Sequence, residues 1–311
     1  MSKKIAFVFP GQGSQSVGML SVLAAKHPII QDTFAQASAI LGYDLWHLSQ
    51  NGPEETLNQT EMTQPILFCA DVAIWRLWQQ EKGPQPTLMT GHSLGEYAAL
   101  ACADAIDFVT GLHLVKERGR LMQEAVPEGK GAMLAVIGLD VEPLQALCQT
   151  VAQGQVLAPA NYNAPGQIVV AGETEAIERL FLAAKQAGAK LVKRVAMSVP
   201  SHCELMKPAA QKLAHYLQGV TIHTPTLSVL NNVDIRVESK SERIKDALVR
   251  QLYHPIRWVE LVQSCVAQGI ELIVECGPAK VLAGLNKRIT SIPTLSIQGP
   301  ESFALALQES Q

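Results

Sequence analysis

The sequence lacks the cysteine pairs of a zinc site and the long apolar run of a membrane helix. Its cysteines are scattered, with no Cys-x-x-Cys pair, at positions 69, 102, 148, 203, 265 and 276. We interpret them as reduced, mostly buried thiols of a cytoplasmic protein, and expect neither a disulfide framework nor a metal site. No run reaches 18 apolar residues, so no membrane span is expected. The apolar run after Lys3 and Lys4 stops at Pro10, which is too short for a signal peptide.

The sequence also lacks an excess of charge of either sign. Its 25 Lys and Arg residues nearly balance 28 Asp and Glu, for a formal net charge of −3, which argues against a nucleic-acid-binding protein. Apolar residues make up 48% and charged residues 17% of the chain, as in a globular protein with a substantial core. A length of 311 residues suits one large α/β unit or two lobes.

The most informative stretch is Gly91-His92-Ser93-Leu94-Gly95. It follows an extended run at 87–90 and precedes a helical run at 96–103, which is the context of a nucleophile elbow. Glycines on either side permit the sharp turn. The helix start beside the serine would place the amide of Leu94 near its oxygen. The alternative is an ordinary turn serine that caps the helix.

A second loop, Pro10 to Gln15, follows a continuous apolar run at 5–9 that predicts a buried strand. A dinucleotide fingerprint would need a glycine at position 16, which is Ser16. An acyl-transfer site needs two oxyanion donors, and the elbow supplies one of them. The backbone amide of Gln12 is the candidate for the other, although the loop could equally be a tight strand-to-helix connection.

Helices are expected at 17–41, 63–81 and 107–126, the last with an apolar stripe through Leu112, Val115, Met122 and Val126. Arg118 falls in phase with that stripe. A buried guanidinium needs an anion, because burying it unpaired costs several kcal/mol. A structural ion pair and a bidentate grip on a substrate carboxylate are both open.

The segment 128–196 has its own order of elements. Strands are expected at 132–138, 155–161, 167–172 and 189–195, and helices at 141–152 and 174–187. This βαββαβ order is ferredoxin-like and predicts a small subdomain inserted into a larger one made of 1–127 and 197–311. The larger part alternates strands and helices, as expected of an α/β core with a mostly parallel sheet. Asn161 and Asn163 could line a cleft between the two parts or form turns.

His202 is the favoured catalytic base, since it follows a proline-containing loop where the chain returns to the larger part. Seven other histidines compete, at positions 27, 47, 92, 113, 215, 223 and 254. Cys203 is a rival nucleophile without an elbow around it.

Seven motifs occur in order along nearly the whole chain: FVFPGQGSQ, GHSLGEYAAL, RGRLMQ, NAPGQIVVAG, VPSHCELM, QLYHPIRW and ECGPAKVL. With these motifs the sequence resembles the malonyl-CoA:acyl carrier protein transacylases of fatty-acid synthesis. The resemblance implies an α/β-hydrolase-like core and an enzyme with a serine–histidine dyad, in which malonyl-CoA acylates Ser93 and His202 moves the proton.

The resemblance also implies roles for other residues. The amides of Gln12 and Leu94 would form the oxyanion hole, Arg118 would hold the malonyl carboxylate, and Gln251 would orient His202 through its carbonyl. We expect Asn163 to line the same site.

The resemblance implies two partners, malonyl-CoA and an acidic acyl carrier protein whose phosphopantetheine thiol accepts the malonyl group. No metal or cofactor of the enzyme itself is expected, and a monomer is expected.

Between 185 and 212 six basic residues face one acid, Glu204. We interpret Lys190, Lys193 and Arg194 as part of the docking surface, with a solvated face as the alternative. A serine hydrolase and a carrier-protein-binding scaffold are the rival functions.

Overall fold

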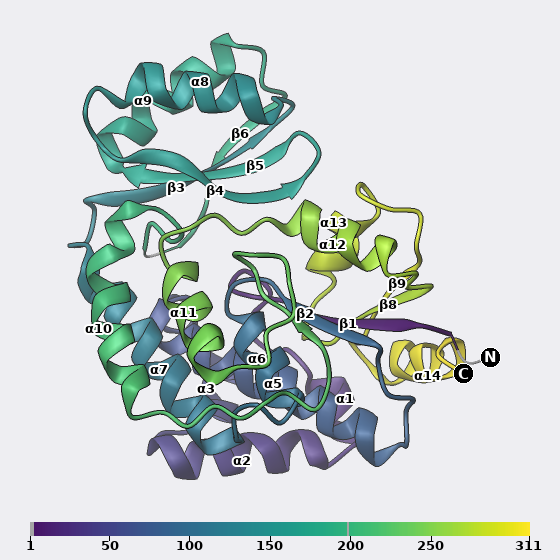
Figure 1. The fold of residues 1–311 in the computed structure, drawn as a ribbon. Coiled ribbons are helices and arrows are strands. Elements are labelled where there is room, and N and C mark those ends of the chain that lie inside the picture. Colours follow the sequence, from purple (N-terminus) through teal and green to yellow (C-terminus); the bar gives the residue numbers. More distant parts are fainter. Residues whose placement is uncertain (1–2, 198) are drawn as a thin grey trace.

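The structure is a computed structural model that describes residues 3–197 and 199–311 (Figure 1). Within those residues, five parallel strands form sheet A in the order β7-β2-β1-β8-β9. Their bounds are β1 Ile5–Phe9, β2 Leu88–Gly91, β7 Val229–Leu230, β8 Leu272–Glu275 and β9 Thr294–Ser296. This parallel sheet confirms the predicted α/β class.

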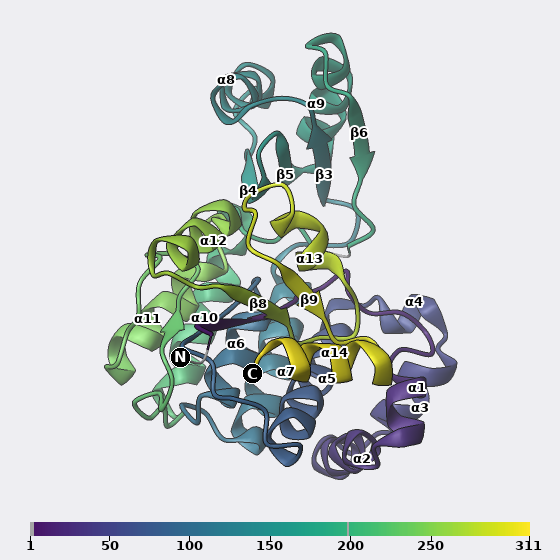
Figure 2. The same cartoon turned by 90° about the vertical axis from the view of Figure 1, so that its right-hand side faces the viewer.

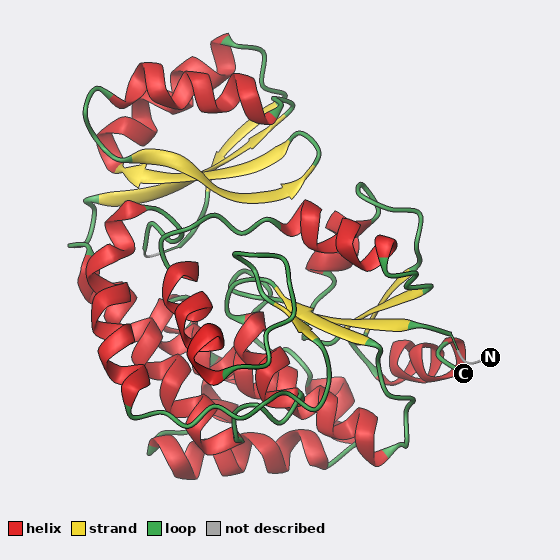
Figure 3. Cartoon of the chain, in the orientation of Figure 1, coloured by secondary structure: helices red, strands yellow, loops and turns green. Residues whose placement is uncertain are grey.

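Strand β1 shows why sheet A is covered on both faces. Its residues are all buried, and successive side chains point to opposite sides. Phe7 and Phe9 belong to the core beneath helices α5 (Thr60–Gln80) and α6 (Gly95–Cys102). Ala6 and Val8 belong to a second core with α12 (Trp258–Ala267) and α13 (Val281–Asn286). Helices therefore lie on either side of the sheet (Figure 3).

The N-terminal helical region differs from the prediction. The expected helix at 17–41 is two helices, α1 (Ser21–Lys26) and α2 (Ile29–Leu41). The break falls at His27, whose backbone is extended before Pro28, as a residue preceding proline prefers. Between the expected helices at 17–41 and 63–81 the chain also forms α3 (Leu45–Asn51), α4 (Glu54–Leu57) and the first turn of α5.

Sheet B is antiparallel, in the order β4-β5-β3-β6, and stands apart from sheet A (Figures 1 and 2). Its elements are β3 Gly131–Ile137, α8 Val141–Ala152, β4 Leu157–Ala164, β5 Gln167–Glu173, α9 Thr174–Gln186 and β6 Leu191–Arg194. Element order and strand order are those of the predicted ferredoxin-like unit. Helices α8 and α9 pack on one face around an apolar core.

Sheet B is joined to the larger part by more than its two chain connections. The backbone of β4 bonds the loop before α12, through Tyr162 N to Ile256 O (2.9 Å) and Ile256 N to Ala160 O (2.8 Å). Because these bonds continue β4 onto the larger part, they hold the end of the small lobe beside the carboxyl ends of β1 and β2. The boundaries at 127/128 and 196/197 stay predictions.

The other helices complete the larger part: α7 Phe108–Ala125, α10 Lys207–Gln218, α11 Ser241–Gln251 and α14 Pro300–Glu309. Helix α14 brings the C-terminal end beside the N-terminal end, where Lys3 bonds Glu309 (Figure 2). Across the described ranges, none of the helices is long and apolar enough to span a bilayer.

Candidate active site

Ser93 lies on a strained turn between β2 and α6. Its φ is +55°, in the left-handed region that L residues rarely occupy. A Cβ on Gly91 would overlap the backbone of Gly95, and one on Gly95 would overlap the carbonyl of Phe9. The two glycines are therefore needed for the close approach of strand and helix, while the serine itself adopts the unusual conformation. This is the geometry of a nucleophile elbow.

The hydroxyl of Ser93 is within hydrogen-bonding distance of His202. Ser93 Oγ lies 2.8 Å from His202 Nε2, and His202 Nδ1 lies 2.7 Å from the backbone carbonyl of Gln251. A carbonyl can only accept, so Nδ1 carries the proton and Nε2 is left as the acceptor for the serine hydroxyl. His202 is therefore oriented as a base, with a carbonyl rather than a carboxylate behind it.

The surroundings of His202 keep it neutral. It is 3% exposed, and burial, together with the charge of Arg118, lowers its pKa to about 3. A neutral imidazole at physiological pH is the form that can take a proton from Ser93.

Arg118 on α7 points into the same site. It is 1% exposed, and its Nη2 donates to Ser93 Oγ (3.1 Å) and to Gln251 Oε1 (3.0 Å). Burial lowers its pKa, and the guanidinium lies over the ring of Tyr97. It has no acidic partner within 4 Å among the described residues, and its Nε is buried without an acceptor there. This arrangement disfavours the structural ion pair and leaves a donor for an external anion.

The loop after β1 meets the elbow. A Cβ on Gly11 would overlap the carbonyl of His92 and lie 3.7 Å from Leu94 N. Gln12 and Leu94 both line the small cavity that contains Ser93 and Arg118. In residues 3–197 and 199–311 neither amide donates a hydrogen bond to the protein, so both are free for an oxyanion.

The sequence did not predict a buried network beneath the elbow. Asn232 accepts from Ser93 N (2.8 Å) and donates to Gly91 O (2.6 Å). Glu96 accepts from Asn232 N and from the side chain of Gln251. Burial raises the pKa of Glu96 to about 7. One sequence signal was available, since Glu96 is an acid among apolar residues in the first turn after the elbow.

The two asparagines of β4, which were expected at a cleft or in turns, differ in their contacts. Asn163 Oδ1 lies 2.9 Å from His92 Nε2, and it is Asn161 that lines the cavity beside Ser93. Asn161 Oδ1 is buried and has no partner in the described part of the chain. The register of β4 is irregular between 159 and 164, so the two asparagines do not share the same neighbours.

Cys203 does not share the environment of Ser93. It is buried, its Sγ bonds the carbonyl of Pro200, and burial raises the pKa of the thiol to about 12. A thiol that stays protonated is a poor nucleophile. Of the histidines in the described part of the chain, His202 is the one that hydrogen-bonds Ser93 Oγ.

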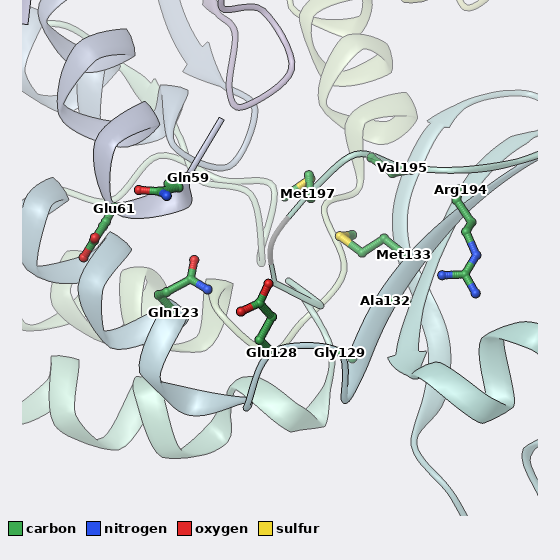
Figure 4. Close-up of a pocket in the computed structure, with 11 residues that line it drawn as sticks. Gln59, Glu61, Gln123, Glu128, Gly129, Ala132, Met133, Arg194, Val195 and Met197 are labelled. Carbon is green, nitrogen blue, oxygen red and sulfur yellow. The ribbon is translucent and has the colours of Figure 1, made fainter. Parts of the chain in front are cut away.

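A larger cavity of about 500 Å³ is lined by residues of both parts of the molecule (Figure 4). Gln59, Glu61 and Gln123 line its side on the larger part, and Arg194 and Met133 line the small-lobe side. Met133 and Met197 also line the inner cavity with Ser93. The two cavities thus share these two lining residues, and sequence patterns had identified neither methionine.

The chain is similar to known proteins over nearly its whole length. A family model described as an acyl transferase domain matches residues 6–296. The malonyl CoA-acyl carrier protein transacylase of Escherichia coli K12 is 55% identical over 306 residues, covering 98% of this chain and 99% of that protein. The Bacillus subtilis protein of the same name is 39% identical over 98% of this chain and 96% of that protein.

Solved structures agree closely with the fold. The malonyl CoA-acyl carrier protein transacylase of Coxiella burnetii gives a TM-score of 0.98 at 48% identity, covering 99% of this chain and 98% of that one. A complex of a type II polyketide-synthase acyl-carrier protein with its malonyl-transacylase gives 0.97 at 54% identity, covering 98% and 99%.

Proposed function

The chain belongs to the acyl transferase domain family, and we propose that it transfers malonyl from malonyl-CoA to the thiol of an acyl carrier protein. The observation that carries the proposal is the convergence of two groups on Ser93 Oγ. His202 Nε2 lies 2.8 Å away and Arg118 Nη2 lies 3.1 Å away, so a base and a carboxylate-binding group meet at one nucleophile. A malonyl thioester presents both features that these groups can use.

The first half-reaction forms an ester. Ser93 Oγ attacks the thioester carbonyl carbon while its proton passes to His202 Nε2. The amides of Gln12 and Leu94 stabilise the oxyanion, and the carbon–sulfur bond then breaks. His202 returns the proton to the departing CoA thiolate. Arg118 pairs with the free carboxylate of the malonyl group throughout.

The second half-reaction repeats these steps with another thiol. The phosphopantetheine thiol of the carrier protein gives its proton to His202, and the sulfur attacks the malonyl ester. Ser93 leaves with that proton, and the malonyl group ends on the carrier protein, as the extender unit that fatty-acid and polyketide assembly consume. A thioester is exchanged for a thioester at little net cost, so a nucleophile, a base and an oxyanion hole suffice without a metal or cofactor.

Specificity for the carboxylate follows from burial. An acetyl group would leave the Arg118 guanidinium without an anion, at a cost of about 1–3 kcal/mol. The absence of an acid behind His202 also separates the site from a serine–histidine–aspartate hydrolase, because Nδ1 bonds the carbonyl of Gln251.

We propose that the carrier protein docks along the exposed edge strand β6. Of the basic residues between 185 and 212, Arg194 pairs with Glu178, Lys207 with Glu204, and Lys212 with Glu124. Lys190 and Lys193 are exposed and, in the described part of the chain, have no acidic partner within 4 Å. Arg194 lines the cavity of about 500 Å³, which shares Met133 and Met197 with the cavity that contains Ser93. An acidic partner would be attracted to this edge.

Intact mass spectrometry after mixing with malonyl-CoA tests the function. We expect one malonyl adduct on Ser93 that persists until a pantetheine thiol is added and then moves to it. Rapid release of free malonate would instead indicate a hydrolase. An unmodified protein would contradict the proposal.

A further inference from the structure

Glu96 is an acid buried next to the nucleophile that no step above uses. It is 2% exposed and lies in the first turn of α6, three residues after Ser93. It has no ion pair within 4 Å in the described structure. Its Oε2 accepts two hydrogen bonds, from Gln251 Nε2 (2.7 Å) and from Asn232 N (3.0 Å). Both donors belong to residues that touch the catalytic groups.

Gln251 links the base to the carboxylate-binding group. Its backbone carbonyl accepts from His202, and its side-chain Oε1 accepts from Arg118. Its Nε2 donates to Glu96 and to the carbonyl of Ser93 (3.0 Å), so both amide hydrogens have close acceptors. One fully buried glutamine therefore holds His202 with its main chain and Arg118 with its side chain.

The orientation of that amide depends on Glu96. Rotated by 180°, the amide would direct its oxygen at the Glu96 carboxylate and its NH₂ at the Arg118 guanidinium. Two repulsive contacts would replace two charge-assisted hydrogen bonds. Among the neighbours of Nε2, Glu96 makes the shortest contact, while the more distant Asn232 Oδ1 is at 3.4 Å. Glu96 on one side and Arg118 on the other thus distinguish the two ends of the amide.

Glu96 acts on the elbow through Asn232 as well. Asn232 receives a hydrogen bond from Ser93 N and donates one to Gly91 O, which clamps the turn on both sides of the serine. Its own backbone N–H donates to Glu96. The acid therefore anchors the two residues, 232 and 251, that hold the strained serine and the two groups around it.

We infer that Glu96 is a positioning residue that fixes the Gln251 amide and the Asn232 main chain, and so keeps His202 and Arg118 aligned on Ser93. The inference rests on the proposed function, because it assigns a role within that same site. Glu96 touches neither the acyl group nor the reacting atoms.

The test compares Glu96→Ala with Glu96→Gln in the full-length enzyme. The measured quantity is the single-turnover rate of Ser93 acylation, followed by rapid quench and intact mass, with malonyl-CoA and with acetyl-CoA. We expect Glu96→Ala to slow malonylation by about 10- to 100-fold, because small misplacements of catalytic groups cost that much. Acetylation, which needs His202 but not Arg118, should fall less.

Glu96→Gln should restore malonylation to within about fivefold of the wild type, because its amide oxygen can accept the same two hydrogen bonds. The matched control is Glu275→Ala. Glu275 is an equally buried glutamate, and its carboxylate accepts from the amides of Leu282 and Ala283 at the start of α13. Its loss should lower the melting temperature while the folded enzyme keeps its ratio of malonyl to acetyl rates.

Three outcomes would overturn the inference: a wild-type malonylation rate in Glu96→Ala, a Gln variant as slow as the Ala variant, or a malonyl-to-acetyl ratio unchanged from the Glu275→Ala control. A wild-type enzyme that forms no malonyl-Ser93 adduct would instead contradict the proposed function, so the two failures are distinguishable.

Discussion

The parts of the molecule built on sheets A and B differ in where they bury polar groups. Around sheet A, the buried polar side chains include Asp71, Glu96, Arg118, His202 and Gln251. In the described residues of 128–196, Asn161 is the buried polar residue, and it lies at the junction with the larger part. The core beneath α8 and α9 is apolar.

This difference separates two tasks. Burying polar groups is costly unless they are hydrogen-bonded, and a satisfied network becomes rigid. In the larger part, buried polar groups surround a strained serine, a base and a guanidinium and hold them at fixed distances. The small lobe closes the cavity with Met133 and Asn161 and offers an exposed basic edge. The buried polar groups of the proposed chemistry thus lie in the larger part, and the proposed docking edge lies on the small lobe.

The largest expected effect is that of Ser93→Ala, which removes the nucleophile from the larger part. Malonyl transfer should fall by about 10³-fold or more, because loss of the nucleophile leaves only binding and oxyanion stabilisation. Intact mass spectrometry should show no stable malonyl adduct. Cys203→Ser is the control and should retain the adduct. An adduct that survives in Ser93→Ala would place the nucleophile elsewhere.

Arg118→Ala tests whether the larger part also binds the malonyl carboxylate. We expect kcat/KM for malonyl transfer to fall about a hundredfold or more, while acetyl transfer persists or rises, because a neutral acyl group no longer leaves a buried cation unpaired. Arg120→Ala is the matched control, since Arg120 lies on the same helix but is paired with Glu117 and Glu124 at the surface. Equal losses for both acyl groups would refute the carboxylate role.

Charge reversal on the small lobe should have a smaller and different effect. In Lys190→Glu/Lys193→Glu the Michaelis constant for the carrier protein should rise about tenfold, with that for malonyl-CoA unchanged, because rim charges act on encounter. The rise should shrink at high salt. Lys26→Glu/Lys82→Glu makes the same change of charge on the larger part and should leave both constants unchanged. A parallel rise in both would argue against a docking edge.

The features that could be predicted from the sequence are those formed by residues close together in the chain. The elbow and the βαββαβ order were predicted because each follows from local features, a Gly-x-Ser-x-Gly turn between two elements or short apolar periods. Residue patterns alone left eight histidines in competition. The resemblance to the transacylases then implied the pairing of Ser93 with His202, and the structure places the two side chains at 2.8 Å.

The buried network was missed because its members are far apart in the sequence. Asn232 and Glu96 are separated by 136 residues, and an asparagine in the stretch after β7 shows no pattern that predicts its partner. Helices α10 and α14 were not predicted at all, and the helix at 17–41 was wrong because the effect of Pro28 was overlooked. Asp71 lies on a helix that the sequence predicts to be apolar. That its carboxyl is buried without a partner among the described residues follows only from the structure.

The smallest expected effect concerns Asp71, and it tests the cost of burying polar groups in the larger part. Both its oxygens are buried and have no hydrogen-bond partner in the described ranges. Burial, followed by the nearby charge of Glu275, raises its pKa well above the ordinary value. The neighbouring thiols Cys69, Cys102 and Cys276 also have raised pKa values because they are buried, so they stay neutral. In the larger part, then, this acid is retained without the satisfied network that surrounds Glu96.

The folded chain holds the proton of Asp71 to a higher pH than the unfolded chain, in which Asp ionises near pH 4. Its contribution to stability is therefore fully present below that value and is lost as the pH rises through the folded-state pKa. Asp71→Asn cannot ionise, so its melting temperature should exceed that of the wild type by about 2–6 °C at pH 8 and by less at pH 5. The exposed Asp32→Asn should show no such trend. If Asp71→Asn and the wild type differ in melting temperature by the same amount at both pH values, the Asp71 carboxyl is hydrated or paired. Burying this acid in the larger part would then cost less stability than its lack of partners indicates.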